Sequence, residues 1–118
     1  MDLLLTDEQE ELRAAVRALL ADRAPSRAVR AAMSSETGYD ADLWRRLGSE
    51  LGVLGLVVPE TEGGSGAGHT ERAVVAEELG RALVPAPFLG SAVLAVDTLM
   101  ALADDTARKD LLPRLACG

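Results

Sequence analysis

The stretch with the clearest chemical potential is a glycine-rich loop, GGSGAG, at residues 63–68. Backbone amides in such a loop can hold phosphate when the glycine spacing fits. A P-loop needs a lysine after the last glycine of its motif, and none follows here. A dinucleotide fingerprint counted from Gly64 would need its third glycine where His69 stands. Glu60 and Glu62 would also repel phosphate, so we interpret the loop as a structural turn.

The other reactive side chains are few. His69 is the single histidine and Cys117 the single cysteine, so a Ser-His-Asp or Cys-His mechanism would depend on a loop histidine beside glycine. A structural zinc site needs four ligands. Adjacent carboxylates occur at 77–78 and 104–105, but neighbouring residues on a helix do not face each other. We therefore expect no catalytic residue, no metal ligand and no cofactor-binding residue in this chain.

Composition narrows the class of protein. The 118 residues fit one domain, and the chain is 48% hydrophobic and 3% aromatic, a balance that favours a globular helical protein. A net charge of −7 argues against nucleic acid and anionic membrane surfaces, which attract basic patches. The N-terminus lacks the features of a signal peptide, and the most apolar window, Pro87 to Ala103, is shorter than the roughly 20 residues that span a bilayer. We expect a cytoplasmic protein.

The first half of the chain reads as three helices. Thr6 followed by Gln9 predicts a capping box, and this helix should end near Ala24 because proline follows. Residues 26–33 add a short helix. Asp40 is the expected N-cap of the next helix. The buried face of that helix should carry Leu43, Trp44, Leu47 and Leu51.

The glycine loop leads into a helix expected from Thr70 to Leu83. Thr70 is the expected N-cap, and Glu71 places negative charge in the first turn, where the helix dipole favours it. Most of the circumference is apolar, which is typical of a helix surrounded by other helices. Glu77 and Arg81 stand four apart, and we interpret them as a solvated charge stripe.

The next element, from Phe88 to Ala103, is apolar or small at nearly every position. Gly90, Ser91, Ala92 and Ala95 leave room on one side. Periodicity alone favours close packing against another helix, and the alternative is one wall of an apolar pocket.

A last helix should start at Asp104 and Asp105 and be interrupted by Pro113. The fold class is therefore all-α, an antiparallel-type helical bundle of about five helices.

Four segments in this order resemble the N-terminal helical domain of an acyl-CoA dehydrogenase. They are TDEQEELRAAVRALLAD, YDADLWRRLGSELGVLGLVVPETEGGSGAG, ERAVVAEELGRAL and PAPFLGSAVLAVDTLMALADDTARKDLLPRLACG. The resemblance covers essentially the whole chain, and its most specific pieces are LGLVVPETEGGSGAG and EELGRAL. The run PFLGSAVLA is similar to actinobacterial members, some of which work as heteromers on steroid side-chain thioesters.

The resemblance implies a flavoprotein oxidoreductase with N-terminal helices, a central β-domain and a C-terminal helical bundle. In this family a glutamate of the C-terminal bundle removes the α-proton of an acyl-CoA, hydride passes to FAD, and an electron-transferring flavoprotein reoxidises the flavin. Residues 1–118 would be the N-terminal helical domain, with the β-domain and C-terminal domain absent. The chain alone is then expected to lack FAD binding and dehydrogenase activity.

The same resemblance assigns substrate-binding positions. The family helix that matches Phe88 to Ala103 lies along the acyl tail, which implies acyl contacts at Pro87, Gly90, Ser91 and Leu94. Small residues at 90 and 91 imply room for a long or bulky acyl group.

A second reading remains open. The chain could be a stand-alone helical interaction module, or a non-catalytic subunit of a heteromeric acyl-CoA dehydrogenase. In the enzyme reading, the complete protein would be a homo- or hetero-oligomer.

Overall fold

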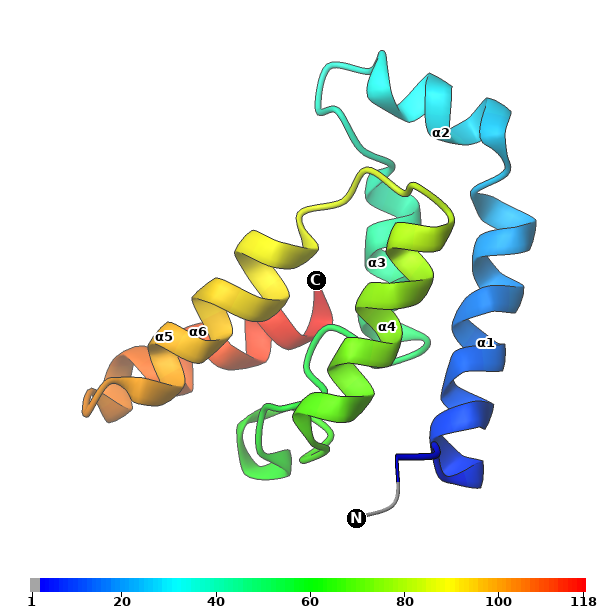
Figure 1. The fold of residues 1–118 in the computed structure, drawn as a ribbon. Coiled ribbons are helices and arrows are strands. Elements are labelled where there is room, and N and C mark those ends of the chain that lie inside the picture. The colour runs from blue at the N-terminus through cyan, green and yellow to red at the C-terminus, as the bar shows by residue number, and fades with distance from the viewer. Residues whose placement is uncertain (1–2) are drawn as a thin grey trace.

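The computed structural model describes residues 3–118, and within that range every regular element is helical, which confirms the all-α prediction. Figure 1 shows the arrangement. The elements are α1 (Asp7–Arg23), α2 (Ser26–Met33), α3 (Ala41–Ser49), the 3-10 turn η1 (Glu60–Glu62), α4 (His69–Arg81), the π-helical segment η2 (Phe88–Ala95), α5 (Val96–Ala101) and α6 (Asp105–Cys117).

The helices form a flat slab of 43 × 40 × 20 Å. α1 and α4 run side by side, and α2 crosses one end of this group (Figure 1). η2 and α5 form one rod that leads away from the group. α6 returns along this rod and ends beside α3 (Figure 1).

Two apolar clusters hold the slab together. The larger joins α1 to α4 with the turns after α3, and its buried members include Val16, Leu20, Leu43, Trp44, Leu47, Val53, Leu54, Val75, Leu79, Phe88 and Ala92. The smaller packs α5 on α6 through Val58, Val96, Leu99 and Leu112. The rod of η2 and α5 is therefore anchored at both ends, by Phe88 and Ala92 in one cluster and by Val96 and Leu99 in the other.

The predicted capping signals of the first half are confirmed. The Thr6 amide donates to Gln9 Oε1 at 3.0 Å, and the Gln9 amide donates to Thr6 Oγ1 at 3.2 Å. Asp40 Oδ1 accepts from the amides of Asp42 and Leu43. These side chains satisfy backbone donors that a helix leaves free at its start, so local hydrogen bonding is sufficient to place the N-terminal ends of α1 and α3.

The predicted N-cap of α4 is wrong. The helix starts at His69 with Gly68 as N-cap, so Thr70 lies inside the first turn. The Gly68 amide donates to Glu71 Oε2 at 3.0 Å, and Gln9 Nε2 on α1 donates to Glu71 Oε1 at 3.2 Å. The Glu71 side chain therefore satisfies the Gly68 amide at the start of α4, and its bond from Gln9 fixes this start against α1.

The predicted interruption at Pro113 is also wrong, because α6 runs through it to Cys117. A proline inside a helix removes one hydrogen bond and costs about 3 kcal/mol. Packing offsets this cost here. Leu112 is 0% exposed and Ala116 5% exposed, on either side of the proline. Pro113 itself packs on Gly63, where an added Cβ would lie 3.2 Å from Pro113 Cα.

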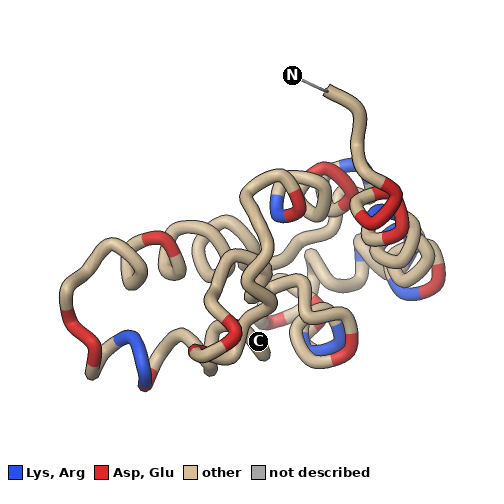
Figure 2. Tube along the Cα trace, turned by 90° about the horizontal axis from the view of Figure 1, so that it is seen from below, with Lys and Arg blue, Asp and Glu red and all other residues tan. Residues whose placement is uncertain are grey.

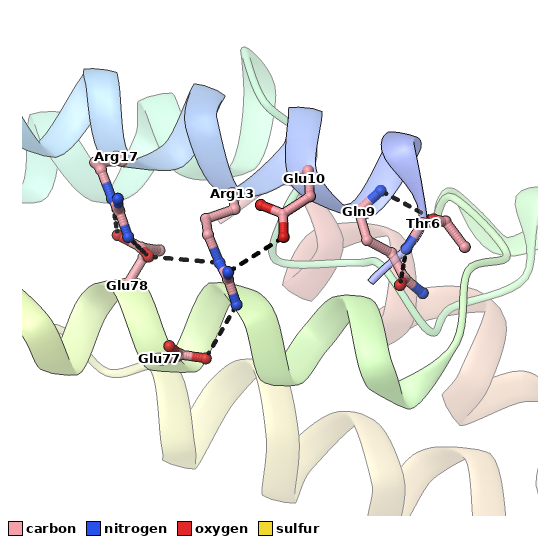
Figure 3. A network of polar contacts seen from close by, with 7 residues as sticks. All are labelled: Thr6, Gln9, Glu10, Arg13, Arg17, Glu77 and Glu78. Carbon is pink, nitrogen blue, oxygen red and sulfur yellow. Dashed lines mark hydrogen bonds and ion pairs between the residues drawn. The ribbon is translucent and has the colours of Figure 1, made fainter. Parts of the chain in front are cut away.

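A network of charges joins α1 to α4 (Figure 3). Glu78 is 1% exposed, and its carboxylate accepts from both Nε and Nη2 of Arg17. Arg13 Nη2 lies 3.4 Å from Glu77 Oε2. The expected i,i+4 partner of Glu77 was Arg81, so the structure replaces a pair within α4 by one between helices.

Candidate functional site

The longest stretch of sequence without a charged residue includes all of η2 and the first residue of α5. Residues 82–96 contain no Lys, Arg, Asp or Glu, and the trace in Figure 2 is correspondingly free of both charge colours there. Leu89 is 65% exposed and Leu94 57% exposed on this segment. Large apolar side chains gathered on one exposed element typically mark a surface that meets another molecule or domain.

The segment takes a wider turn than the sequence predicts. We expected one regular helix from Phe88 to Ala103, whereas the rod begins as the π-helix η2 and ends as α5 at Ala101. π-helical turns are rare in proteins as a whole, and those that occur are frequently found at functional sites. Phe88 and Ala92 lie on its buried side, with exposed fractions of 8% and 1%.

All four residues expected to line an acyl pocket lie on or at the start of η2. Pro87 is its N-cap, and the Pro87 carbonyl accepts from the Ser91 amide at 2.9 Å. Pro87 and Ser91 are half-buried, while Gly90 and Leu94 are exposed. The four residues therefore lie along one element, with Gly90 and Leu94 exposed on it.

Gly90 faces open space, since a Cβ added to it would meet no heavy atom within 4 Å. Nothing in the packing of the described chain therefore requires glycine at this position. A larger side chain there would project outward without disturbing the slab.

A polar cluster lies behind this surface, on the α4 side. Arg72 Nη1 lies 2.7 Å from Asp97 Oδ1, and its Nη2 lies 2.9 Å from Asp97 Oδ2. The Arg72 hydrogen bonds hold the pKa of the Asp97 carboxyl below its usual range. Arg72 Nη2 also lies 3.1 Å from His69 Nδ1, which accepts because a guanidinium only donates.

Sequence reasoning missed this cluster. Arg72 counted as one of several charges on α4, and Asp97 counted only as a break in an apolar window. No local spacing links positions 72 and 97, so only the packing of α4 against the rod brings them together. The cluster borders an open groove of about 450 Å³ lined by Val57, Ala67, His69, Asp97, Met100 and Ala101.

The glycine loop is closed on itself. The amides of Gly64, Ser65 and Gly66 donate to the carbonyls of Pro59, Gly55 and Val58. A Cβ at position 64 would clash with Val58, so glycine is required there for the chain to pass. These contacts make the loop a structural turn, because its amides already donate to carbonyls of residues 55–59 and are not free to hold a phosphate.

Residues 3–118 contain neither of two further kinds of feature. No group of three or more His, Cys, Asp or Glu side chains lies together as metal ligands there. The same range contains no helix with the length and apolar character needed to cross a membrane.

The fold and this uncharged surface define a class of protein. Residues 6–118 match the family model described as "Acyl-CoA dehydrogenase, N-terminal domain". The chain therefore belongs to the acyl-CoA dehydrogenase family, whose members are flavoprotein oxidoreductases that generally use FAD.

The chain is similar to particular members of this family to different degrees. The chain is 48% identical over 114 residues to the acyl-CoA dehydrogenase IpdE2 of Mycolicibacterium smegmatis, covering 97% of this chain and 35% of that protein. It is 32% identical over 116 residues to the mitochondrial isovaleryl-CoA dehydrogenase of Pongo abelii, covering 97% of this chain and 27% of that protein. The chain thus spans about a third of the length of these relatives.

Two solved complexes share the fold. The ChsE4-ChsE5 complex from Mycobacterium tuberculosis superposes with a TM-score of 0.87 at 27% identity, over 99% of this chain and 32% of that chain. A variant of the Tcur3481-Tcur3483 steroid ACAD superposes with a TM-score of 0.85 at 33% identity, over 95% of this chain and 30% of that chain. Each of these two structures is named for a pair of proteins.

Proposed function

We propose that this chain acts as the N-terminal helical domain of a flavin-dependent acyl-CoA dehydrogenase, in which the outward side of η2 forms one wall of the acyl pocket. The observation that carries the proposal is the uncharged π-helical surface, with exposed Leu94 and open space at Gly90. An acyl tail is apolar, and a wall without charges accepts it without leaving a charged group unpaired.

Each of the four residues has a distinct part in this wall. Leu94 supplies apolar contact area. Gly90 leaves depth for a long or bulky acyl group. Pro87 and Ser91, half-buried at the base of the segment, border the tail where the rod meets the core. The reaction itself depends on groups outside residues 1–118.

Bound FAD would accept the hydride from the β-carbon of the acyl group. The glycine loop does not fit the role of holding its phosphates, since the loop amides already donate to carbonyls of residues 55–59. Neither the catalytic base nor the FAD site is therefore assigned to this chain, and an electron-transferring flavoprotein would be the partner of the complete enzyme. In this proposal η2 shapes the acyl pocket and takes no part in the chemical steps.

The test is a size change at the open position. In the complete enzyme, Gly90→Phe should shift the preference in kcat/KM from octanoyl-CoA toward butanoyl-CoA, because the ring fills the depth of the pocket. Gly80→Phe is the matched control, since Gly80 also lies on a helix with no heavy atom within 4 Å of an added Cβ. An unchanged chain-length preference in Gly90→Phe would contradict the pocket wall.

A second candidate is a non-catalytic subunit of a heteromeric acyl-CoA dehydrogenase. It is favoured by the two solved neighbours, each of which is named for a pair of proteins. Co-expression with neighbouring acyl-CoA dehydrogenase genes, followed by native mass spectrometry, separates the candidates. A stable complex with a different subunit that carries the flavin and the base supports this second function, while an active enzyme built from one kind of chain contradicts it.

A further inference from the structure

Arg72 of α4 contacts both parts of the rod that carries the proposed acyl wall. Its side chain is 12% exposed, against 45% for Asp97. Besides the two bonds to the Asp97 carboxylate, Arg72 Nη1 donates to the carbonyl oxygen of Ala92 at 3.3 Å. One guanidinium on α4 therefore contacts both the middle of η2 and the first turn of α5.

The two contacts lie on either side of the change from π-helix to α-helix. Ala92 belongs to η2, and Asp97 is the second residue of α5. A π turn holds more residues than an α turn, so conversion of one into the other shifts the register by one residue. Such a shift rotates the residues on one side of the turn by about 100° relative to those on the other.

That rotation would act directly on the proposed wall. Gly90 and Leu94 face outward only in the register that the structure shows, with Phe88 and Ala92 buried behind them. A one-residue shift would turn the buried side chain of Phe88 and the open position at Gly90 to directions different from the present ones. Whatever holds the π turn therefore decides which side chains face the acyl group.

We propose that Arg72, paired with Asp97, is a positioning residue that holds the π-helical register of η2 and thereby sets which acyl groups the wall accepts. This inference rests on the proposed function for the acyl wall. Arg72 touches no substrate in this scheme and acts through Ala92 and Asp97. The planar fork of an arginine suits this task, because it binds both carboxylate oxygens while a third bond reaches the Ala92 carbonyl.

The first experiment measures the register without turnover. Amide hydrogen exchange is followed over residues 88–96 in the 118-residue chain and in the complete enzyme. Arg72→Met should raise exchange in this segment about tenfold, because the π turn loses its lateral support. The matched control is Arg81→Met, an exposed arginine on the same helix, which should leave the segment unchanged.

The second experiment measures acyl selection in the complete, FAD-loaded enzyme. The ratio of kcat/KM for cyclohexylpropanoyl-CoA to that for butanoyl-CoA should change by about tenfold in Arg72→Met, as expected for a displaced pocket contact. Asp97→Asn, which keeps the bond to Ala92, should change it less. Arg72→Lys should restore only part of the ratio, because an ammonium cannot bind both partners as a fork.

The outcomes separate the two proposals. A wild-type enzyme that turns over none of the thioesters would overturn the acyl wall and the selection role together. An active wild type with the same acyl preference in Arg72→Met and Arg81→Met would overturn the positioning role alone. Unchanged exchange over residues 88–96 in Arg72→Met would overturn it independently of any activity.

Discussion

The guanidinium of Arg17 on α1 binds the buried carboxylate of Glu78 on α4 in a side-on pair, with Nη2 2.6 Å from Oε1 and Nε 3.0 Å from Oε2 (Figure 3). The hydrogen bonds from Arg17 hold the pKa of Glu78 below its usual range. This pair fixes α4 against α1, and α4 in turn carries Arg72 behind the proposed acyl wall. The Arg17–Glu78 pair thus helps to hold in place the helix whose Arg72 contacts η2.

Removal of the cation should destabilise the fold. Arg17→Met removes both hydrogen-bond donors of the buried Glu78 carboxylate and leaves it with Arg13 Nε, 3.8 Å away, and the charge of Arg81, and an incompletely paired buried charge is costly. Urea denaturation should give a lower midpoint for Arg17→Met than for the control Arg45→Met, whose side chain is 66% exposed. Equal midpoints for the two variants would contradict a structural role for the pair.

Stability should fall in acid, and the sign follows from three carboxyls. The pKa values of Glu78 and Asp97 are lowered chiefly by hydrogen bonds from Arg17 and Arg72, and that of Glu71 by backbone and Gln9 hydrogen bonds. Folded pKa values below the unfolded values of about 4 add stability above that pH. This stability is lost as pH falls through the folded values.

Unfolding free energies measured in urea between pH 7 and pH 2 test this linkage. The slope below about pH 4 should be shallower in the double variant Glu78→Gln, Asp97→Asn, because the wild type takes up protons at these two carboxyls on unfolding and the variant, with amides in their place, does not. Replacement of the exposed loop residue Glu36 by Gln should leave the slope unchanged. A slope in the double variant equal to that of the wild type would refute the assignment.

Two glycines should respond in opposite directions to alanine. A Cβ on Gly64 would clash with the Val58 backbone in a closed loop, so Gly64→Ala should destabilise by about 2 kcal/mol. Gly80 lies in α4 with nothing near its added Cβ, so Gly80→Ala should stabilise by about 0.5 kcal/mol. Thermal denaturation of both variants measures the contrast: stabilisation by Gly64→Ala would show that the loop is not tightly packed, and destabilisation by Gly80→Ala would show that position 80 is not open.

Local chemistry accounts for what the sequence could predict. The capping box of Thr6 and Gln9 and the cap at Asp40 involve residues three or fewer apart, so their outcome depends little on the rest of the chain. The family was predicted from four sequence segments that, in their order, resemble the N-terminal domain of an acyl-CoA dehydrogenase. The four proposed wall residues followed from it, and they stay a prediction that the size change at Gly90 will test.

The features that could not be predicted depend on contacts distant in sequence. Pro113 continues a helix because residues on both sides are buried against other elements. The Arg72–Asp97 pair joins residues 25 positions apart with no shared motif. Glu78 did offer a signal, since it lies three residues after buried Val75 on the same side of α4. A carboxylate on an apolar helix side indicates a buried pair, and that inference was available from the sequence.

The exposed apolar side of η2 should make the isolated chain self-associate. Leu89 and Leu94 are more than half exposed, and burial of each between two copies would release part of the roughly 1.5–3 kcal/mol that full burial of a leucine gives. Sedimentation velocity of the 118-residue chain should therefore show concentration-dependent association. The double variant Leu89→Ser, Leu94→Ser should reduce it, whereas the control Leu102→Ser, at a residue 47% exposed in the turn after α5, should not. A wild-type chain that stays monomeric over a wide concentration range would mean that this side of η2 is compatible with water, and would weaken its assignment as a surface built to meet an acyl group and further domains.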